Sequence, residues 1–149
     1  RAEPFSERFF WPGTWDPTPA LCAGDAIDYL ESLVEGGWPA LMERNHNLCL
    51  EARKLICNNL GIGLPCPDSM IASMASIPLP LSPAGNPPDY KSYDPFQVRL
   101  LEEHHIEIPV WHWSNPPVLM TRISVQLYNS PEQYRYLSGV LAGMTGCRP

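Results

Sequence analysis

Hydrophobic and polar positions alternate along one stretch near the C-terminal end of the chain. Between Leu119 and Leu127, one set of alternate positions holds Leu119, Thr121, Ile123, Val125 and Leu127, and the other holds Met120, Arg122, Ser124 and Gln126. A two-residue period with one apolar face predicts a half-buried β-strand. The alternation therefore places Arg122 on the sheet face opposite the packed one.

A helical period of apolar positions appears in other segments. We expect a helix from about 19 to 34, ending at Gly36-Gly37, and a longer one from about 39 to 60. The longer one carries Leu41, Leu48, Ala52, Leu55, Ile56 and Leu60 on one side, with Glu43, Glu51, Arg53 and Lys54 at other positions. Its roughly 22 residues would span about 33 Å, which suits a strut between two domains. Shorter helices are expected at 95–104 and from 131 onward.

Two further strands are expected at about 70–77 and 106–113. The proline-rich segment 78–88 predicts a surface loop, because proline supplies no N–H to a ladder. A short turn at 115–117 joins the last two strands, which must therefore pair antiparallel. The pattern predicts an α+β fold with a small antiparallel three-stranded sheet, helices on one face only, and Arg122 on the bare face.

Proline is abundant, with 18 residues, but its positions indicate order. Pro19, Pro39, Pro95 and Pro131 all lie at expected helix starts, where the missing N–H costs nothing. The segment Ser130-x-x-Gln133 also fits a capping box.

Charge and composition exclude several classes of protein. A net charge of -6 argues against nucleic-acid binding, and no apolar run approaches the roughly 20 residues needed to span a membrane. The five cysteines include no CxxC pair, so we expect free, mostly buried thiols in the cytoplasm and no metal site.

Taken alone, the individual chemical candidates leave alternatives open. Arg122 on a strand can be a solvated or salt-bridged surface residue, or it can grip a carboxylate through two parallel hydrogen bonds. Gly13-Thr14 offers a hydroxyl and backbone N–H groups to an oxyanion. For His112, a hydrogen-bonded residue at the edge of the core is favoured over a catalytic base. Cys66 lies in a loop without a recognised nucleophile motif.

Two of these segments carry a resemblance to a known family. The segment TRISVQLYNSPEQYRYL resembles the C-terminal motif of the class V aminotransferase and cysteine desulfurase superfamily, in which an Arg-x-Ser strand precedes Tyr-Asn-Thr/Ser and a helix. The segment RFFWPGTWDPT resembles the corresponding stretch of its isopenicillin N epimerase-like branch. The resemblance runs from Arg8 to Leu141.

The resemblance implies a set of roles. Arg122 would bind the α-carboxylate of an amino-acid substrate, and Gly13 and Thr14 would contact the pyridoxal 5'-phosphate of the partner subunit in a homodimer. Residues 1–37 would be the end of a large cofactor domain. Residues 38–149 would be a linking helix and the small domain that folds onto that upstream domain.

The chain has two lysines, Lys54 and Lys91, and neither lies in the family's Schiff-base motif. We therefore expect no catalytic residue in this chain, which should be inert alone as the C-terminal part of a longer enzyme. Epimerisation, β-elimination and C–S lysis remain open for the intact parent. The alternatives are a non-catalytic binding or dimerisation module derived from that family and an unrelated α+β domain.

Overall fold

The structure is a computed structural model that describes residues 13–81 and 93–147. The chain divides into two compact units between Ala40 and Leu41. The assignment of the first unit to a cofactor domain stays a prediction.

The first unit contains helices α1 (Thr18–Leu21) and α2 (Ala23–Ser32), and neither has a buried residue. The single helix predicted for 19–34 is therefore interrupted at Cys22. Gly36 and Gly37 follow with φ values of 90° and 63°, a left-handed backbone that glycine adopts without a Cβ penalty.

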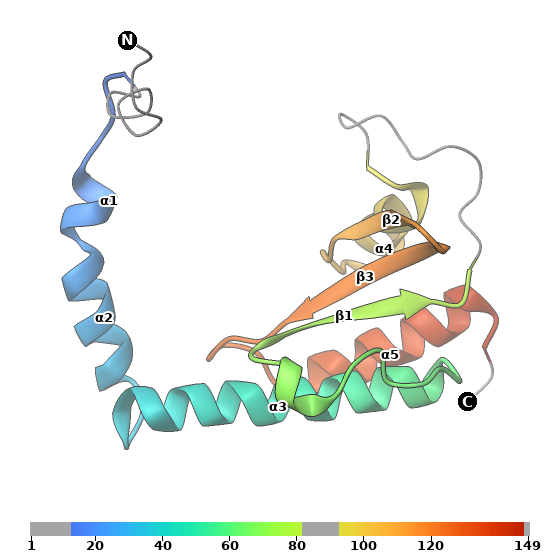
Figure 1. Cartoon of the computed structure of the whole chain (residues 1–149), viewed down its shortest axis with the longest axis horizontal. Helices are drawn as coiled ribbons and strands as arrows, with labels where there is room; N and C mark the ends of the chain where they lie inside the picture. Colours follow the sequence, from blue (N-terminus) through green and yellow to red (C-terminus); the bar gives the residue numbers. More distant parts are fainter. Residues whose placement is uncertain (1–12, 82–92, 148–149) are drawn as a thin grey trace, which may run out of the picture. The chain divides into compact units, whose positions relative to one another are not determined.

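The second unit contains the predicted three-stranded antiparallel sheet (Figure 1). Strands β1 (Met74–Leu79), β2 (Val110–Ser114) and β3 (Pro117–Ser124) lie in the order β1-β3-β2. The α+β fold class is confirmed.

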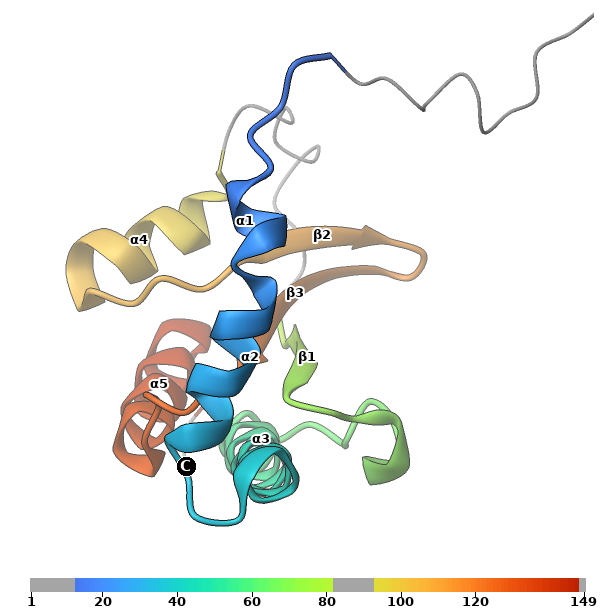
Figure 2. The ribbon, with the colours of Figure 1, turned by 90° about the vertical axis from the view of Figure 1, so that its left-hand side faces the viewer.

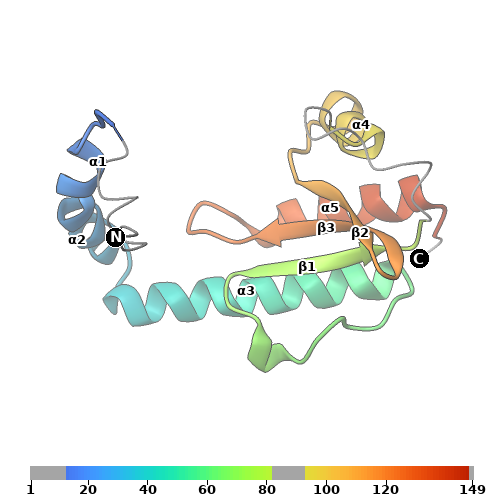
Figure 3. The ribbon, with the colours of Figure 1, turned by 45° about the horizontal axis from the view of Figure 1, so that its top comes forward.

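Three helices cover one face of this sheet. From Leu41 onward, α3 (Gly37–Asn59) runs beside α5 (Pro131–Thr145), as Figures 1 and 3 show. The Asn59 amide also donates to the Ser138 hydroxyl at 2.8 Å. Helix α4 (Pro95–His104) lies near β2 (Figure 2). The strand residues buried on this face are Ala75, Ile77, Leu79, Val110, Leu119, Thr121 and Ile123.

Strand boundaries differ from the predictions for local reasons. A 3-10 turn at Asp68–Met70 precedes β1, which starts later than expected and includes Pro78, opposite Met120. Because β1 is an edge strand, it tolerates a residue without an N–H. Strand β2 starts at Val110 rather than near 106, since Pro109 has no N–H to extend the ladder.

The predicted helix starts are confirmed for α4 and α5, each of which has proline in its first turn. The Asp94 carboxylate caps α4 by accepting from the Phe96 N–H at 2.7 Å. Helix α4 ends at a left-handed His105, with φ 55°. The expected strut role of α3 between domains stays a prediction.

All five cysteines are free, and two of them, Cys49 and Cys57, are buried. Burial raises the pKa of Cys49 to about 11, so this thiol stays protonated at neutral pH. In residues 13–81 and 93–147, no helix is long and apolar enough to cross a membrane. The same ranges contain no cluster of three potential metal ligands. The predicted cytoplasmic location stays a prediction.

Candidate functional site

A cavity of about 320 Å³ lies beside the edge of β3 that β2 leaves unpaired. Strand β2 pairs with β3 only from Val110 onward, and the preceding residues form the far wall. The remaining walls come from the end of β3 and the start of α5. The lining residues include Ile106, Glu107, Ile108, Arg122, Ser124, Asn129, Gln133, Tyr134 and Leu137.

Arg122 lies on the bare face of the sheet, opposite Ser76 of β1, as the alternation predicted. Its side chain is exposed, and it makes no hydrogen bond or ion pair with another described residue. A guanidinium has five N–H donors and no acceptor. Arg122 is therefore available to an anionic ligand in the cavity, and its predicted role as carboxylate ligand stays a prediction.

The end of β3 is held in place by Tyr134 of α5. The Tyr134 hydroxyl donates to the carbonyl oxygen of Ser124 at 2.7 Å. This side chain is 6% exposed, and burial raises the pKa of Tyr134 to about 12. The hydroxyl consequently remains protonated and able to donate across the physiological range. On the far wall, the Thr121 hydroxyl donates to the carbonyl of Pro109 at 2.9 Å.

A polar turn connects β3 to α5 at the base of the cavity. The Gln126 N–H donates to Asn129 Oδ1 at 2.9 Å, and Asn129 Nδ2 donates to Gln133 Oε1 at 3.1 Å. The Ser130 N–H donates to the same Gln133 oxygen at 3.1 Å, which is the half of the predicted capping box that Gln133 supplies. The turn is thus fixed by its own side chains.

Helix α3 braces this turn through Arg44 and Asn45. Arg44 donates to the carbonyl of Asn129 and to Asn45 Oδ1, each at 3.0 Å. Asn45 is 7% exposed and donates to Gln126 Oε1 at 3.1 Å. Sequence reasoning missed this pair. The available signal was Asn45 itself, a polar residue one helical turn from both Leu41 and Leu48 in the apolar stripe.

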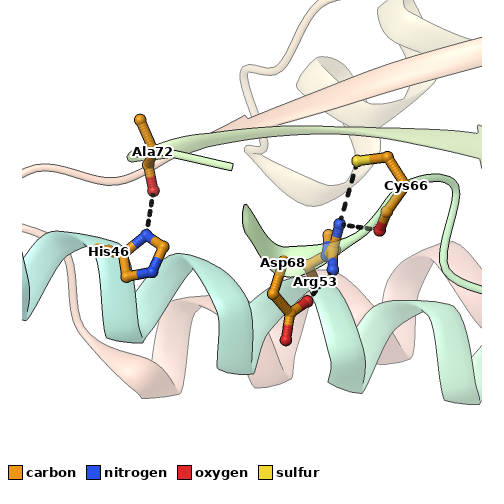
Figure 4. A network of polar contacts seen from close by, with 5 residues as sticks. All are labelled: His46, Arg53, Cys66, Asp68 and Ala72. Carbon is orange, nitrogen blue, oxygen red and sulfur yellow. Dashed lines mark hydrogen bonds and ion pairs between the residues drawn. The ribbon is translucent and has the colours of Figure 1, made fainter. Parts of the chain in front are cut away.

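A second polar cluster surrounds Arg53 of α3 (Figure 4). Arg53 is 1% exposed, and it donates to the Cys66 carbonyl at 3.0 Å and the Cys66 sulfur at 3.4 Å. It also pairs with Asp68, and nearby His46 Nδ1 lies 3.1 Å from the Ala72 carbonyl. The sequence analysis placed Arg53 outside the apolar side of its helix and did not foresee that it is buried. These contacts attach the 62–72 segment to α3.

His112 is a satisfied residue at the edge of the core, as expected. Its Nε2 lies 2.7 Å from Asp94 Oδ2, and both side chains are nearly buried. Asp94 also caps α4, so the pair attaches that helix to β2.

Gly13 and Thr14 belong to the first unit. Gly13 has a φ of 101°, which favours glycine, and a Cβ there would contact nothing within 4 Å. Thr14 is exposed. The predicted phosphate contacts of both residues stay predictions, and Phe9 to Pro12 of the same motif lie outside the described residues.

Pyridoxal 5'-phosphate needs a lysine for its Schiff base. Lys54 is exposed on α3 and does not line the Arg122 cavity, and Lys91 lies outside the described residues. The described residues therefore do not fit this cofactor as a complete site, although Arg122 is suited to hold a substrate's carboxylate.

No known protein-family model matches the chain. It is 30% identical over 142 residues to "Probable L-cysteine desulfhydrase, chloroplastic" of Arabidopsis thaliana, an alignment that covers 90% of this chain and 29% of the relative. It is 26% identical over 150 residues to "Putative L-cysteine desulfhydrase 2" of Oryza sativa subsp. japonica, covering 89% of this chain and 30% of that protein. It is 27% identical over 143 residues to "Putative L-cysteine desulfhydrase 1" of the same organism, an alignment that covers 85% of this chain and 29% of that protein.

The chain thus spans less than a third of the length of these curated relatives. The aligned region is their C-terminal part. The chain is a distant homologue of the C-terminal part of L-cysteine desulfhydrases.

Proposed function

We propose that this chain is the substrate-binding C-terminal part of a pyridoxal-phosphate-dependent enzyme that cleaves the C–S bond of cysteine. Arg122 binds the α-carboxylate of the amino acid. The names of the relatives support the reaction class, and the family resemblance supports the cofactor and the role of the arginine.

The observation that carries the proposal is the unpartnered guanidinium of Arg122 beside a cavity. Arg122 is exposed, so water satisfies its donors in the absence of a ligand, and a carboxylate in the cavity can replace that water through two parallel hydrogen bonds. Tyr134, Asn129 and Gln133 frame the cavity through hydrogen bonds that do not use Arg122. The hydrogen bonds that frame the cavity therefore form without the Arg122 side chain. The N–H donors of Arg122 remain available for a ligand.

The cofactor and its lysine come from outside the described residues under this proposal. Pyridoxal phosphate, when bound, supplies the electron sink for chemistry at the substrate Cα. The contribution of this chain is to fix the carboxylate, which orients the bonds at Cα. Epimerisation, the activity of the resembled branch, is the alternative outcome for the same orientation.

The remaining assembly follows the resemblance. The bare face of the sheet would meet the upstream cofactor domain of the same polypeptide. Gly13 and Thr14 would reach the cofactor phosphate of a partner subunit in a homodimer. The φ of 101° at Gly13 is a backbone conformation that glycine adopts readily and that other residues rarely adopt.

The test is Arg122→Ala in the protein produced from its complete reading frame with pyridoxal phosphate supplied. We expect the KM for L-cysteine, followed by sulfide release, to rise roughly tenfold to hundredfold, since a charge-assisted pair is lost. Bound cofactor, measured by visible absorbance, should stay unchanged. Arg99→Ala is the matched control, because Arg99 is exposed on α4 and pairs with Glu103 away from this cavity.

Equal losses of cofactor and substrate binding would contradict the carboxylate role of Arg122. A folded protein that takes up no cofactor and releases no sulfide would instead favour a non-catalytic binding module.

A further inference from the structure

We propose that the Gln133 carboxamide is a second carboxylate ligand, donating from Nε2 beside Arg122. This inference rests on the proposed function, because it concerns the same substrate site. Gln133 and Arg122 line the same cavity from different elements, the first turn of α5 and the end of β3.

The direction of the Gln133 carboxamide follows from its partners. Its oxygen receives the backbone N–H of Ser130 and the Nδ2 hydrogen of Asn129, each at 3.1 Å. A backbone N–H can only donate, so the atom facing Ser130 must be Oε1. The nitrogen of the same amide therefore points away from the turn. No described residue accepts a hydrogen bond from this nitrogen, which leaves both of its hydrogens for a ligand.

The Asn129 side chain donates to Gln133 and so orients its carboxamide. The Gln126 N–H must also face an acceptor, which fixes Asn129 Oδ1 and directs Asn129 Nδ2 toward Gln133. Arg44 of α3 holds the Asn129 carbonyl at 3.0 Å. The orientation of Gln133 is thus set by a chain of hydrogen bonds that reaches back to the long helix.

The cavity wall formed by β3 and α5 consequently presents donors. The Ser124 carbonyl already accepts one hydrogen bond, from the Tyr134 hydroxyl. The one acidic residue in the lining, Glu107, belongs to the wall that precedes β2 and is exposed. A carboxylate has about four lone-pair sites, and a bidentate arginine uses two of them. The Gln133 Nε2 donor is suited to bind one of the carboxylate lone-pair sites that the arginine leaves free.

Gln133→Glu separates ligand binding from folding. Glutamate keeps the oxygen that caps Ser130, and the capping box accepts Glu as readily as Gln. An acidic residue in the first turn of a helix is also favourable. The substitution removes only the Nε2 donor and places a negative charge beside the ligand's carboxylate. We expect an unchanged or slightly higher melting temperature, together with a KM for L-cysteine raised about tenfold or more.

Two comparisons isolate the carboxylate. Cysteamine is cysteine without its carboxylate, and its inhibition constant as a competitor should be unchanged in Gln133→Glu. Gln97→Glu is the matched control, since Gln97 Oε1 likewise accepts a backbone N–H, from Val110 at 2.7 Å, and Gln97 lies outside this cavity. Gln133→Ala, which adds no charge, should give a smaller rise of about threefold.

The outcomes distinguish this inference from the proposed function. If Arg122→Ala raises the KM for L-cysteine and both Gln133 variants leave it unchanged, the second ligand is refuted and the proposed function stands. If Arg122→Ala also has no effect, both proposals fail. Equal weakening of L-cysteine and cysteamine in Gln133→Glu would overturn the role of Gln133 as a carboxylate ligand.

Discussion

Two arginines of the second unit occupy opposite environments. Arg53 on α3 is 1% exposed and contacts the carbonyl and sulfur of Cys66 and the carboxylate of Asp68. Arg122 on β3 is exposed, and its side chain makes no hydrogen bond or ion pair with another described residue. The same side chain therefore serves the fold in one place and remains available in the other.

The difference shows why pairing is more informative than residue type. A buried guanidinium must exchange water for protein acceptors, and Arg53 does so through Nη1 and Nη2, while its Nε is buried without a partner. Its donors are used or enclosed and cannot serve a ligand. Arg122 keeps its hydration and its donors until a ligand arrives.

The largest effect is expected for Arg53→Ala. The substitution leaves the Cys66 carbonyl without its donor, opens a cavity beside α3 and releases the 62–72 segment. We expect the free energy of unfolding at pH 7 to fall by about 3 to 4 kcal/mol. Urea denaturation followed by circular dichroism measures it, with the exposed Arg99→Ala as the control. A loss below about 1 kcal/mol would show that the cluster contributes little to stability.

Alkaline pH should weaken the frame around Arg122. The folded-state pKa values of Tyr134 and Cys49 are raised, to about 12 and about 11, from ordinary values of 10.0 and 9.0. The unfolded chain therefore loses these protons first. The stabilisation is complete below about pH 9 and declines as pH rises toward 12, by about 3 to 4 kcal/mol at pH 11.

Urea denaturation at pH 8 and pH 11 measures this decline. Tyr134→Phe should reduce it, since only the contributions of the buried thiols, whose pKa values are also raised, then remain. A decline that is the same in Tyr134→Phe as in the original protein would exclude Tyr134 as a cause.

The sequence predicted the position of Arg122 because a strand's two faces follow from a period of two residues. It also predicted the starts of α4 and α5, since proline and capping residues act locally. These features depend on neighbours within a few residues along the chain. They needed no knowledge of what packs against them.

The features that were missed depend on distant contacts. Arg44 and Asn45 donate to Asn129 and Gln126, which lie 85 and 81 positions away in the sequence. A pattern within a few residues cannot predict contacts between such distant positions. The burial of Arg53 was missed because it depends on the 62–72 segment, which no pattern within the helix could reveal. The start of β2 was misplaced because the apolar alternation continued through Pro109, where the ladder ends.

A smaller effect is expected for Asp68→Asn. Asp68 is 64% exposed, so water already screens its attraction to Arg53. The amide oxygen can still accept from the guanidinium. We expect the free energy of unfolding to fall by less than about 1 kcal/mol in the same urea experiment. A loss as large as that of Arg53→Ala would mean that the ion pair, rather than the Cys66 carbonyl, holds the cluster together.

The smallest effect on stability is expected for Arg122→Ala. The side chain is exposed and unpaired, and its cross-strand neighbour Ser76 offers no charge. The hydrogen bonds that frame the cavity do not involve it. The free energy of unfolding should therefore change by less than about 0.5 kcal/mol. The same variant should lose affinity for a carboxylate ligand, so stability and binding would separate at this residue. A stability loss above about 1 kcal/mol would mean that Arg122 has a partner within the protein, and the contrast with Arg53 would no longer hold.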